Sequence, residues 1–345
     1  MRGPGTSIYL VALLGSLSNC DGFAHPRKFT LSHSVRMLST AEAPIEKLPR
    51  ERYVATNRFT VRSGKEAAFE KRWATRKSRL ASLEGFKYFH LMRRVSIDAD
   101  SIAESSDDDD DEFNYVSFTI WNDKKAFNAW RNGDAFKEAH GGSDIFSFLK
   151  TMISSTMVMT GPPRPAFYDG LLQQSSVPGE VPTTVDGWRD VAADGVSLLP
   201  AEAFVACNRF FVPEESAAAF EARWANRESK LSACDGFVSF SMLRRDVKAK
   251  GHGVTPLRDG EASYQSTTVW RDQAAFDAWR KGNAFKQAHG QATPPSSGEG
   301  GGGAPALAHA PPASGGVPPS TPLWSSPPKP VFYEATLVIS SPDGA

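Results

Sequence analysis

The chain has 345 residues, enough for two or three domains that each bury a core of their own. Lys and Arg together number 39, as do Asp and Glu, and this balance gives no support to nucleic acid or another polyanion as a partner. The three cysteines, Cys20, Cys207 and Cys234, have neither zinc-site spacing nor the density of a disulfide scaffold, so a bound metal must be held by other residues.

The N-terminal residues are typical of a targeting leader. Residues 8–17 form a mostly apolar run of signal-peptide length, too short to span a bilayer comfortably. Residues 23–41 contain Arg, Lys, Ser and Thr but no acidic residue, which is transit-peptide composition. Residues 21–26 resemble the cleavage region of bipartite plastid leaders. We therefore expect a signal peptide over 1–22, a transit peptide and leader over 23–50, and no stable membrane span after processing. The expected destination is a plastid, with mitochondrion or secretion as alternatives.

The rest of the chain contains an internal repeat. Residues 53–94 and 204–245 agree at 21 of 42 positions. The similarity is lost across a variable loop, whose acidic run over 107–112 predicts a solvated and mobile insertion. It resumes over residues 115–168 and 264–333. The sequence therefore predicts two tandem copies of one domain.

The first copy predicts a strand, a helix, a two-strand hairpin, a second helix and a final strand. The first strand alternates and is rich in β-branched and aromatic residues. The first helix is amphipathic and is expected to run from Gly64 to a stop at Gly85, and Asp123 is expected to cap the second. A last turn, capped by Asp134, is expected to reach His140. The predicted strands are residues 53–61, 86–95, 115–121 and 166–172.

This order of elements is that of a ferredoxin-like βαββαβ fold, so we expect an α+β protein. The expected domains are residues 51–172 and 203–340, joined by a linker over 173–202 that contains at most a short helix. A Pro/Gly-rich insertion over 291–329 of the second copy is expected to be disordered, because it cannot bury enough apolar surface. Residues 145–159 of the first copy are apolar and predict a helix that packs over a neighbouring surface.

Four segments carry a resemblance to a known family: Asn57-Arg58-Phe59-Thr60-Val61, Leu83-Glu84-Gly85-Phe86, the stretch from Trp121 to Trp130, and Phe136-Lys137-Glu138-Ala139-His140. They resemble the antibiotic biosynthesis monooxygenase superfamily. Within it they are most similar to the heme-degrading monooxygenases of the iron-regulated surface determinant type and their algal relatives. The similarity covers about residues 53–172 and again 204–338.

The resemblance implies a quaternary arrangement. In that family two ferredoxin-like subunits join their sheets into a dimeric α+β barrel, and heme lies between the helices and the sheet of each subunit. In this chain the two subunits would be fused into one polypeptide. We therefore expect an intramolecular pseudo-dimer.

The resemblance also implies three roles in each copy. One His is the proximal ligand of the heme iron, one Asn is the distal amide that hydrogen-bonds iron-bound oxygen, and one Trp presses the porphyrin out of plane. Imidazole is a good iron ligand, and an amide can donate a hydrogen bond without titrating. The residues at these positions are His140, Asn57 and Trp130 in the first copy and His289, Asn208 and Trp279 in the second.

Each of these residues has a structural alternative. A His near a helix end can cap carbonyl groups or lie at the surface. Trp130 and Trp279, at the end of an amphipathic helix, can be core residues. Asn57 within a strand can bond to a neighbouring loop.

The resemblance implies that the protein is a heme-degrading monooxygenase, for which heme is both cofactor and substrate. Ring cleavage would yield an open-chain tetrapyrrole and free iron, with electrons from a ferredoxin or an NADPH-dependent reductase. Heme binding without turnover, as a carrier or sensor, is one alternative. Cofactor-independent oxygenation of a quinol or phenol is another. The first copy is expected to bind heme more tightly, because apolar residues follow His140 whereas a Pro/Gly-rich tract follows His289.

Overall fold

The computed structural model describes residues 46–97, 113–139, 157–176, 183–227, 229–249, 256–258, 260–282 and 323–341. The leader up to residue 45 and the acidic run over 107–112 lie outside the described residues. So do most of the predicted helix over 145–159 and most of the insertion over 291–329. The expectations for these segments stay predictions. Among the described helices, none is long and apolar enough to cross a membrane.

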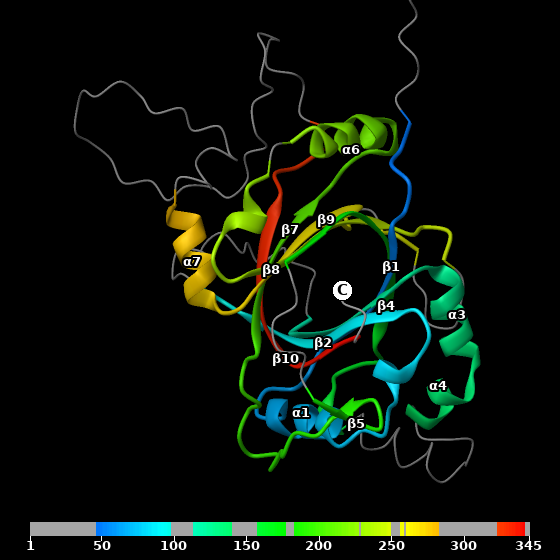
Figure 1. The fold of residues 1–345 in the computed structure, drawn as a ribbon, viewed down its shortest axis with the longest axis vertical. Coiled ribbons are helices and arrows are strands. Elements are labelled where there is room, and N and C mark those ends of the chain that lie inside the picture. The colour runs from blue at the N-terminus through cyan, green and yellow to red at the C-terminus, as the bar shows by residue number, and fades with distance from the viewer. Residues whose placement is uncertain are drawn as a thin grey trace, which may run out of the picture. The chain divides into compact units, whose positions relative to one another are not determined.

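The two copies share the order strand, helix, 3₁₀ turn, strand, strand, helix and strand (Figure 1). The first copy comprises β1 (Arg52–Phe59), α1 (Glu66–Ala74), the 3₁₀ turn η1 (Leu80–Ser82), β2 (Phe86–Val95), β3 (Tyr115–Trp121), α3 (Lys124–Asn132), α4 (Asp134–Ala139) and β4 (Arg164–Ser175). The second comprises β7 (Ala203–Phe210), η2 (Glu214–Ser216), α6 (Ala217–Ala225), η3 (Leu231–Ala233), β8 (Phe237–Arg245), β9 (Tyr264–Trp270), α7 (Gln273–Lys281) and β10 (Lys329–Ser340). Between them lie two short strands, β5 (Thr184–Val185) and β6 (Trp188–Arg189).

The two sheets join into one closed barrel in the order β1-β3-β2-β10-β7-β9-β8-β4. Each copy contributes a sheet of ferredoxin-like order, β4-β1-β3-β2 and β10-β7-β9-β8. Strand β2 pairs antiparallel with β10, and β4 pairs antiparallel with β8. The helices α1, α3, α6 and α7 lie outside the ring of strands (Figure 1). The predicted α+β fold, two ferredoxin-like modules fused into a dimeric barrel, is confirmed.

The barrel wall has two faces with different surroundings. Successive residues of a strand point to opposite faces, so β1 contributes to two cores. Tyr53, Ala55 and Phe59 belong to the layer between the sheet and the helices, whereas Val54 belongs to the barrel interior. The second copy repeats this arrangement, with Phe204 and Phe210 in its own outer layer.

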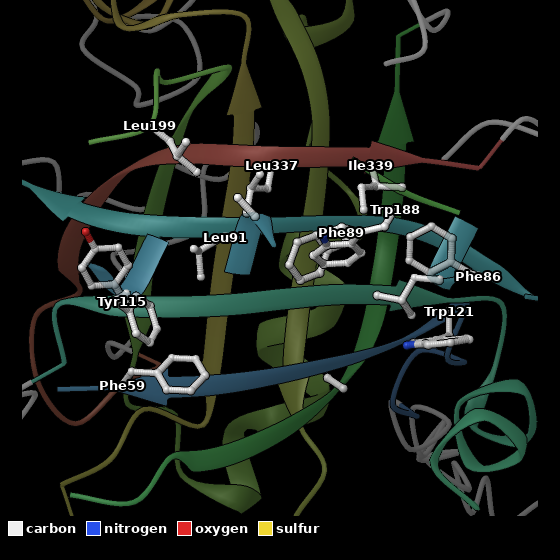
Figure 2. Close-up of a cluster of buried hydrophobic side chains, with 14 of the residues drawn as sticks. Phe59, Phe86, Phe89, Leu91, Tyr115, Trp121, Trp188, Leu199, Leu337 and Ile339 are labelled. Carbon is white, nitrogen blue, oxygen red and sulfur yellow. The ribbon is translucent and has the colours of Figure 1, made fainter. Parts of the chain in front are cut away.

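The outer layer of the first copy extends onto a strand of the second copy. Figure 2 shows Phe59, Tyr115 and Phe89 on β1, β3 and β2, with Leu337 and Ile339 of β10 beside them. All five side chains are buried in one cluster. Burying apolar area across the β2·β10 junction adds to the backbone pairing that closes the barrel.

The connection between the two copies packs on the first copy, where a linker with at most a short helix was expected. Strands β5 and β6 pair as a hairpin that places Trp188 at 4% exposure. The ring of Trp188 lies 5.1 Å from that of Phe89, and its indole N–H donates to the carbonyl of Trp73 at 3.1 Å. Gly187 makes the turn (φ +83°), and a Cβ there would lie 2.8 Å from the backbone of Arg79. Burial of the Trp188 indole, next to the tight turn, completes the core of the first copy and stabilises the hairpin against it.

The first helix is shorter than the amphipathic pattern predicts. It ends at Ala74 instead of continuing toward Gly85. The hydroxyl of Thr75 donates to the carbonyl of Lys71 at 2.9 Å, a local bond that competes with continued helix. The chain then forms η1, and the N–H of Ala81 donates to the carbonyl of Gly187 at 3.0 Å. Contact with the interdomain hairpin therefore ends the helix earlier than the apolar periodicity of the sequence predicts.

A carboxylate from α1, that of Glu70, is fully buried and ties the two copies together. It accepts hydrogen bonds from the hydroxyl of Tyr115 at 2.8 Å, from Arg93 at 2.6 Å and from the backbone N–H of Leu199 at 2.6 Å. Leu199 belongs to the segment that leads into the second copy. Burial and the neighbouring carboxylate raise the pKa of Tyr115, which keeps its hydroxyl a donor.

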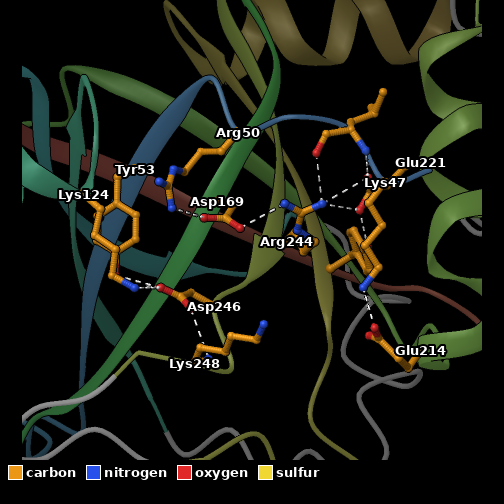
Figure 3. A network of polar contacts seen from close by, with 12 residues as sticks. Lys47, Arg50, Tyr53, Lys124, Asp169, Glu214, Glu221, Arg244, Asp246 and Lys248 are labelled. Atoms are coloured by element: carbon orange, nitrogen blue, oxygen red, sulfur yellow. Dashed lines mark hydrogen bonds and ion pairs between the residues drawn. The ribbon is translucent and has the colours of Figure 1, made fainter.

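Glu221 of α6 occupies the equivalent position in the second copy. It accepts from the hydroxyl of Tyr264 and the backbone N–H of Leu48, both at 2.5 Å, and from Arg244 at 2.9 Å. Leu48 precedes the first copy, so the segment before each copy crosses to the other. Arg244 lies between Glu221 and Asp169, to which it is paired at 3.0 Å across the β4·β8 junction (Figure 3).

Replacing Glu221 with Ala should lower the free energy of unfolding by about 3 kcal/mol, because the buried hydroxyl of Tyr264 and the N–H of Leu48 lose their acceptor and the partly buried Arg244 loses one of its two carboxylates. Glu70→Ala is expected to have a similar effect. The matched control is Glu214→Ala, whose carboxylate pairs with Lys47 while 85% exposed and should change stability by under about 1 kcal/mol. Urea unfolding measures all three variants. Equally small changes would contradict the role given to the buried carboxylates.

His90 of β2 is buried inside the barrel. It is 0% exposed, and neither ring nitrogen has a hydrogen-bond partner among the described residues. The rings of Tyr88 and Phe118 each lie 5.0 Å away. Burial lowers the pKa of His90 to about 3, because the charged imidazolium would lose its hydration without gaining a partner.

This depressed pKa predicts sensitivity to acid. Below about pH 6.5 the unfolded chain takes up a proton at His90 while the native protein does not, so stability falls as the pH falls. At about 1.4 kcal/mol per unit, His90 costs about 2 kcal/mol near pH 5. Between neutral pH and about pH 5, the unfolding free energy of the parent protein should therefore fall by about 2 kcal/mol more than that of His90→Phe. Parallel pH dependences of the variant and the parent protein would contradict it.

Candidate functional site

Asn57 lies on β1 in the face that the helices cover. It lies on the same face of the strand as Ala55 and Phe59, which belong to the outer apolar layer. Its side chain is partly buried, and its amide makes no hydrogen bond with another described residue. A bond to a neighbouring loop, the structural alternative, is therefore not present among the described residues.

Asn208 occupies the equivalent place on β7. It faces the outer layer that contains Phe204 and Phe210, and it pairs in register with Ser266 and Pro330. Its side-chain carbonyl oxygen is buried and has no hydrogen-bond partner among the described residues. Leaving a buried polar group unsatisfied costs about 1–3 kcal/mol, so the position demands an explanation other than packing.

Trp130 lies on α3 and packs its indole against the outer face of the sheet. Asp123 caps this helix by accepting from the N–H of Ala126 at 2.8 Å, as expected. The ring of Trp130 stacks on Trp121 with centroids 5.3 Å apart, and Phe136 of α4 meets it edge-on at 5.1 Å. Trp130 takes part in core packing while part of its side chain stays exposed.

Trp279 on α7 repeats this arrangement. Its ring lies 5.3 Å from that of Trp270, and Asp272 caps the helix through the N–H of Ala275 at 2.8 Å. In both copies, therefore, the same cap and the same aromatic pair position the predicted Trp over the face that carries the predicted Asn. The structure brings these two predicted site residues to one layer in each copy.

The two predicted iron ligands lie outside the described residues. His140 lies in the gap between the described residues 139 and 157, and His289 lies in the gap between 282 and 323. Helix α4 over Asp134–Ala139 matches the predicted last turn. The assignment of His140 and His289 as ligands therefore stays a prediction.

His90 would be the next candidate ligand by residue type, but its position excludes it from this layer. Phe89 and Leu91 face the outer layer, so His90 between them faces the barrel interior. It therefore lies on the opposite side of the sheet from Asn57 and Trp130.

Two buried donors in the outer layers were not singled out from the sequence. The indole N–H groups of Trp121 and Trp270 have no acceptor among the described residues, although both side chains are 0% exposed. The repeat alignment pairs these residues, but their lack of partners becomes visible only in the structure. Each lies beneath the Trp of the helix above, Trp130 or Trp279.

The outer layer of each copy is thus an aromatic helix–sheet layer in which the side-chain carbonyl of Asn208 and the amide of Asn57 have no partner among the described residues. A flat, largely apolar ligand suits such a layer, and the Asn amide can orient its polar atoms. A planar tetrapyrrole has this character. The residues present in both layers are therefore compatible with heme.

Comparison with known proteins identifies the family. The sequence profile of antibiotic biosynthesis monooxygenase matches residues 52–142 and again residues 203–291. The chain belongs to the antibiotic biosynthesis monooxygenase family and carries two tandem copies of its domain. A relative from Staphylococcus haemolyticus, a staphylobilin-producing heme oxygenase, is 31% identical over 107 residues, which are 31% of this chain and 90% of that protein.

Solved structures resemble the chain more distantly. The heme-degrading enzyme of Listeria monocytogenes is 10% identical with a TM-score of 0.27, covering 68% of this chain and 84% of its own. An anthrone oxidase-like protein is 15% identical with a TM-score of 0.39, covering 87% of this chain and 97% of its own. At these values neither structure bears on function.

The buried side-chain carbonyl of Asn208, which has no partner among the described residues, predicts an unusual response to mutation. Asn208→Ala should lower the unfolding free energy by less than about 1 kcal/mol, or raise it, because the variant no longer buries an unpaired carbonyl. The matched control is Asn114→Ala. Asn114 accepts from the N–H of Val61 at 2.7 Å and donates to its carbonyl at 2.8 Å, so its loss should cost about 1–3 kcal/mol. Urea unfolding compares the two variants, and equal losses would make Asn208 a structural residue.

Proposed function

We propose that the chain is a heme-degrading monooxygenase that cleaves the porphyrin ring to an open-chain tetrapyrrole and releases iron. The observation that carries this proposal is the pair of asparagines, Asn57 and Asn208, whose amides face aromatic helix–sheet layers without bonding to a described residue. An amide left unpaired in an apolar layer is suited to a ligand that supplies its partner.

Two further findings support the proposal. The chain belongs to a family of monooxygenases, and a relative at 31% identity is a heme oxygenase. The predicted triad of Asn, Trp and His occurs in both copies in the same order. Heme, when bound, would supply the iron at which oxygen is reduced and the ring that is cleaved.

The protein's residues have separate tasks in this scheme. An imidazole nitrogen of His140 would hold the iron from one side. The Nδ2 of Asn57 would donate a hydrogen bond near the reacting atoms without changing charge with pH. The indole of Trp130, backed by Trp121 and Phe136, would press on the porphyrin because its own packing leaves it little room to retreat.

Electrons must come from another protein or a soluble reductant. We propose a ferredoxin or an NADPH-dependent reductase, in keeping with a plastid location of the mature chain.

A heme carrier or sensor would need the ligand His but no unpaired amide. A cofactor-independent monooxygenase would need no His at position 140 or 289. The combination of all three residues in each copy therefore favours heme cleavage.

Hemin titration of the mature chain tests the proposal. We expect a Soret band, with one tight equivalent and a second, weaker one, and bleaching of that band when reductant and oxygen are supplied. His140→Ala should abolish the tight equivalent. Asn57→Ala should bind hemin nearly as well but degrade it about 10–1000-fold more slowly, since its donor acts in turnover.

The matched control is His90→Phe, which removes an imidazole from the opposite face of the same sheet and should leave the spectrum and the turnover unchanged. A Soret band that persists without bleaching would indicate a carrier. Hemin binding that survives loss of both His140 and His289 would contradict the ligand assignment. Absence of a Soret band, with quinol oxidation instead, would favour the cofactor-independent alternative.

A further inference from the structure

The barrel contains a cavity of about 450 Å³ at the end where β1 and β7 finish and β4 and β10 begin. Arg58 of β1 and Arg209 of β7 both line it. Each follows an asparagine of the candidate heme layers, so each points to the opposite face of its strand. The cavity is therefore separated from those layers by the barrel wall.

Positive charge dominates the described lining of this cavity. Its cationic residues are Arg58, Arg164, Arg209, Arg258 and Lys329, and its one described carboxylate is Glu261. That carboxylate is already engaged, because Arg58 donates to it at 2.7 Å and Arg245 lies 3.9 Å from it. One carboxylate cannot neutralise five cations, so the described lining keeps a net positive charge.

Two partly buried cations of the lining have no ionic partner among the described residues. Arg164 and Lys329 form no hydrogen bond or ion pair with another described residue. Their charged groups instead lie over aromatic rings, Arg164 at 5.1 Å from the centre of Phe113 and Lys329 at 5.7 Å from the centre of Phe211. Both side chains are partly buried. Cation–π contact offsets only part of the lost hydration, which leaves these groups suited to an anion.

Arg58 adds a third donor held in place from two sides. Its guanidinium lies 5.0 Å from the centre of the Phe113 ring, on which Arg164 also packs. Its side chain is 12% exposed, and its buried Nε has no hydrogen-bond partner among the described residues. Planar guanidinium groups fixed in this way match the oxygens of a carboxylate, sulfonate or phosphate.

The charged end of the cavity is built by both copies. Arg58 corresponds to Arg209 in the repeat, and Arg164 corresponds to Lys329. Strands β1 and β7 lie on opposite sides of the closed barrel. A single copy would present only half of these groups, so the cluster exists because the two copies are joined.

We propose that this cavity binds a small organic anion with an aromatic or otherwise planar apolar body. Its volume is in the range of small-molecule sites, and buried aromatic side chains, Phe113, Phe118 and Tyr168, form part of its wall. The cationic groups would bind the anionic head, and the rings would contact the body. The site is independent of the proposed heme chemistry.

The experiment uses anilinonaphthalene sulfonate as the probe and its uncharged analogue N-phenylnaphthylamine as the control ligand, each titrated into the mature chain by calorimetry. We expect saturable binding of the sulfonate that weakens as salt is raised, and binding of the neutral analogue that is at least about 10-fold weaker. The double variant Arg164→Gln/Lys329→Gln should lose about 10-fold or more in sulfonate affinity.

Two controls distinguish this site from others. Arg271→Gln, which removes an exposed arginine paired with Asp235, should leave sulfonate affinity unchanged. Thermal unfolding should show that the double variant is folded and that the sulfonate raises the Tm of the parent protein but not that of the variant. Hemin titration should be the same in both proteins.

Three outcomes would overturn the proposal. Equal sulfonate affinity in the double variant would place the probe elsewhere. Competition between hemin and the sulfonate would place it in the helix–sheet layers. In a third test, the aspartates at 107–111 are replaced with Asn. Sulfonate binding that occurs only in that variant would mean that the chain's own acidic run, and not an external anion, neutralises the cavity.

Discussion

Hydrogen bonding between β2 and β10 and between β4 and β8 is the constraint on which the rest of the structure depends. A four-stranded ferredoxin-like sheet has two edge strands, and unpaired edges favour association with other chains. In this protein each copy pairs both of its edges with the other copy. The buried carboxylates Glu70 and Glu221 reinforce that closure, because each binds a backbone N–H from the segment that precedes the opposite copy.

Closure of the barrel gives its wall an outer and an inner environment, and successive residues of each strand face them in turn. Asn57 faces an aromatic layer under the helices, whereas Arg58 faces the barrel interior. Asn208 and Arg209 repeat the pattern in the second copy. Two consecutive residues can therefore serve two unrelated sites, one apolar and outward, the other cationic and enclosed. This separation would allow the proposed heme site and the proposed anion site to coexist without sharing a side chain.

The two outer layers are alike in their strands and helices but are completed by different segments. In the first copy Trp188 of the interdomain hairpin packs on Phe89. In the second copy Trp324, which precedes β10, packs its ring 6.3 Å from that of Phe210. These tryptophans do not correspond in the repeat. The difference gives a physical reason, apart from the segments after His140 and His289, to expect unequal ligand affinity in the two copies.

The sequence alone determined the duplication, the order of elements and most strand bounds, because the residue pattern of each copy is strong and is repeated. It also placed Asn57, Trp130 and their counterparts on the strand and helix where they lie, since strand parity and helix capping are local properties. The early end of α1, the interdomain hairpin and the burial of His90 inside the barrel were decided by tertiary structure. Each depends on contacts between residues far apart in the chain, such as the one between Ala81 and Gly187. The cationic cavity could likewise not be predicted from the sequence, because its charges come from both copies and meet only when the barrel closes.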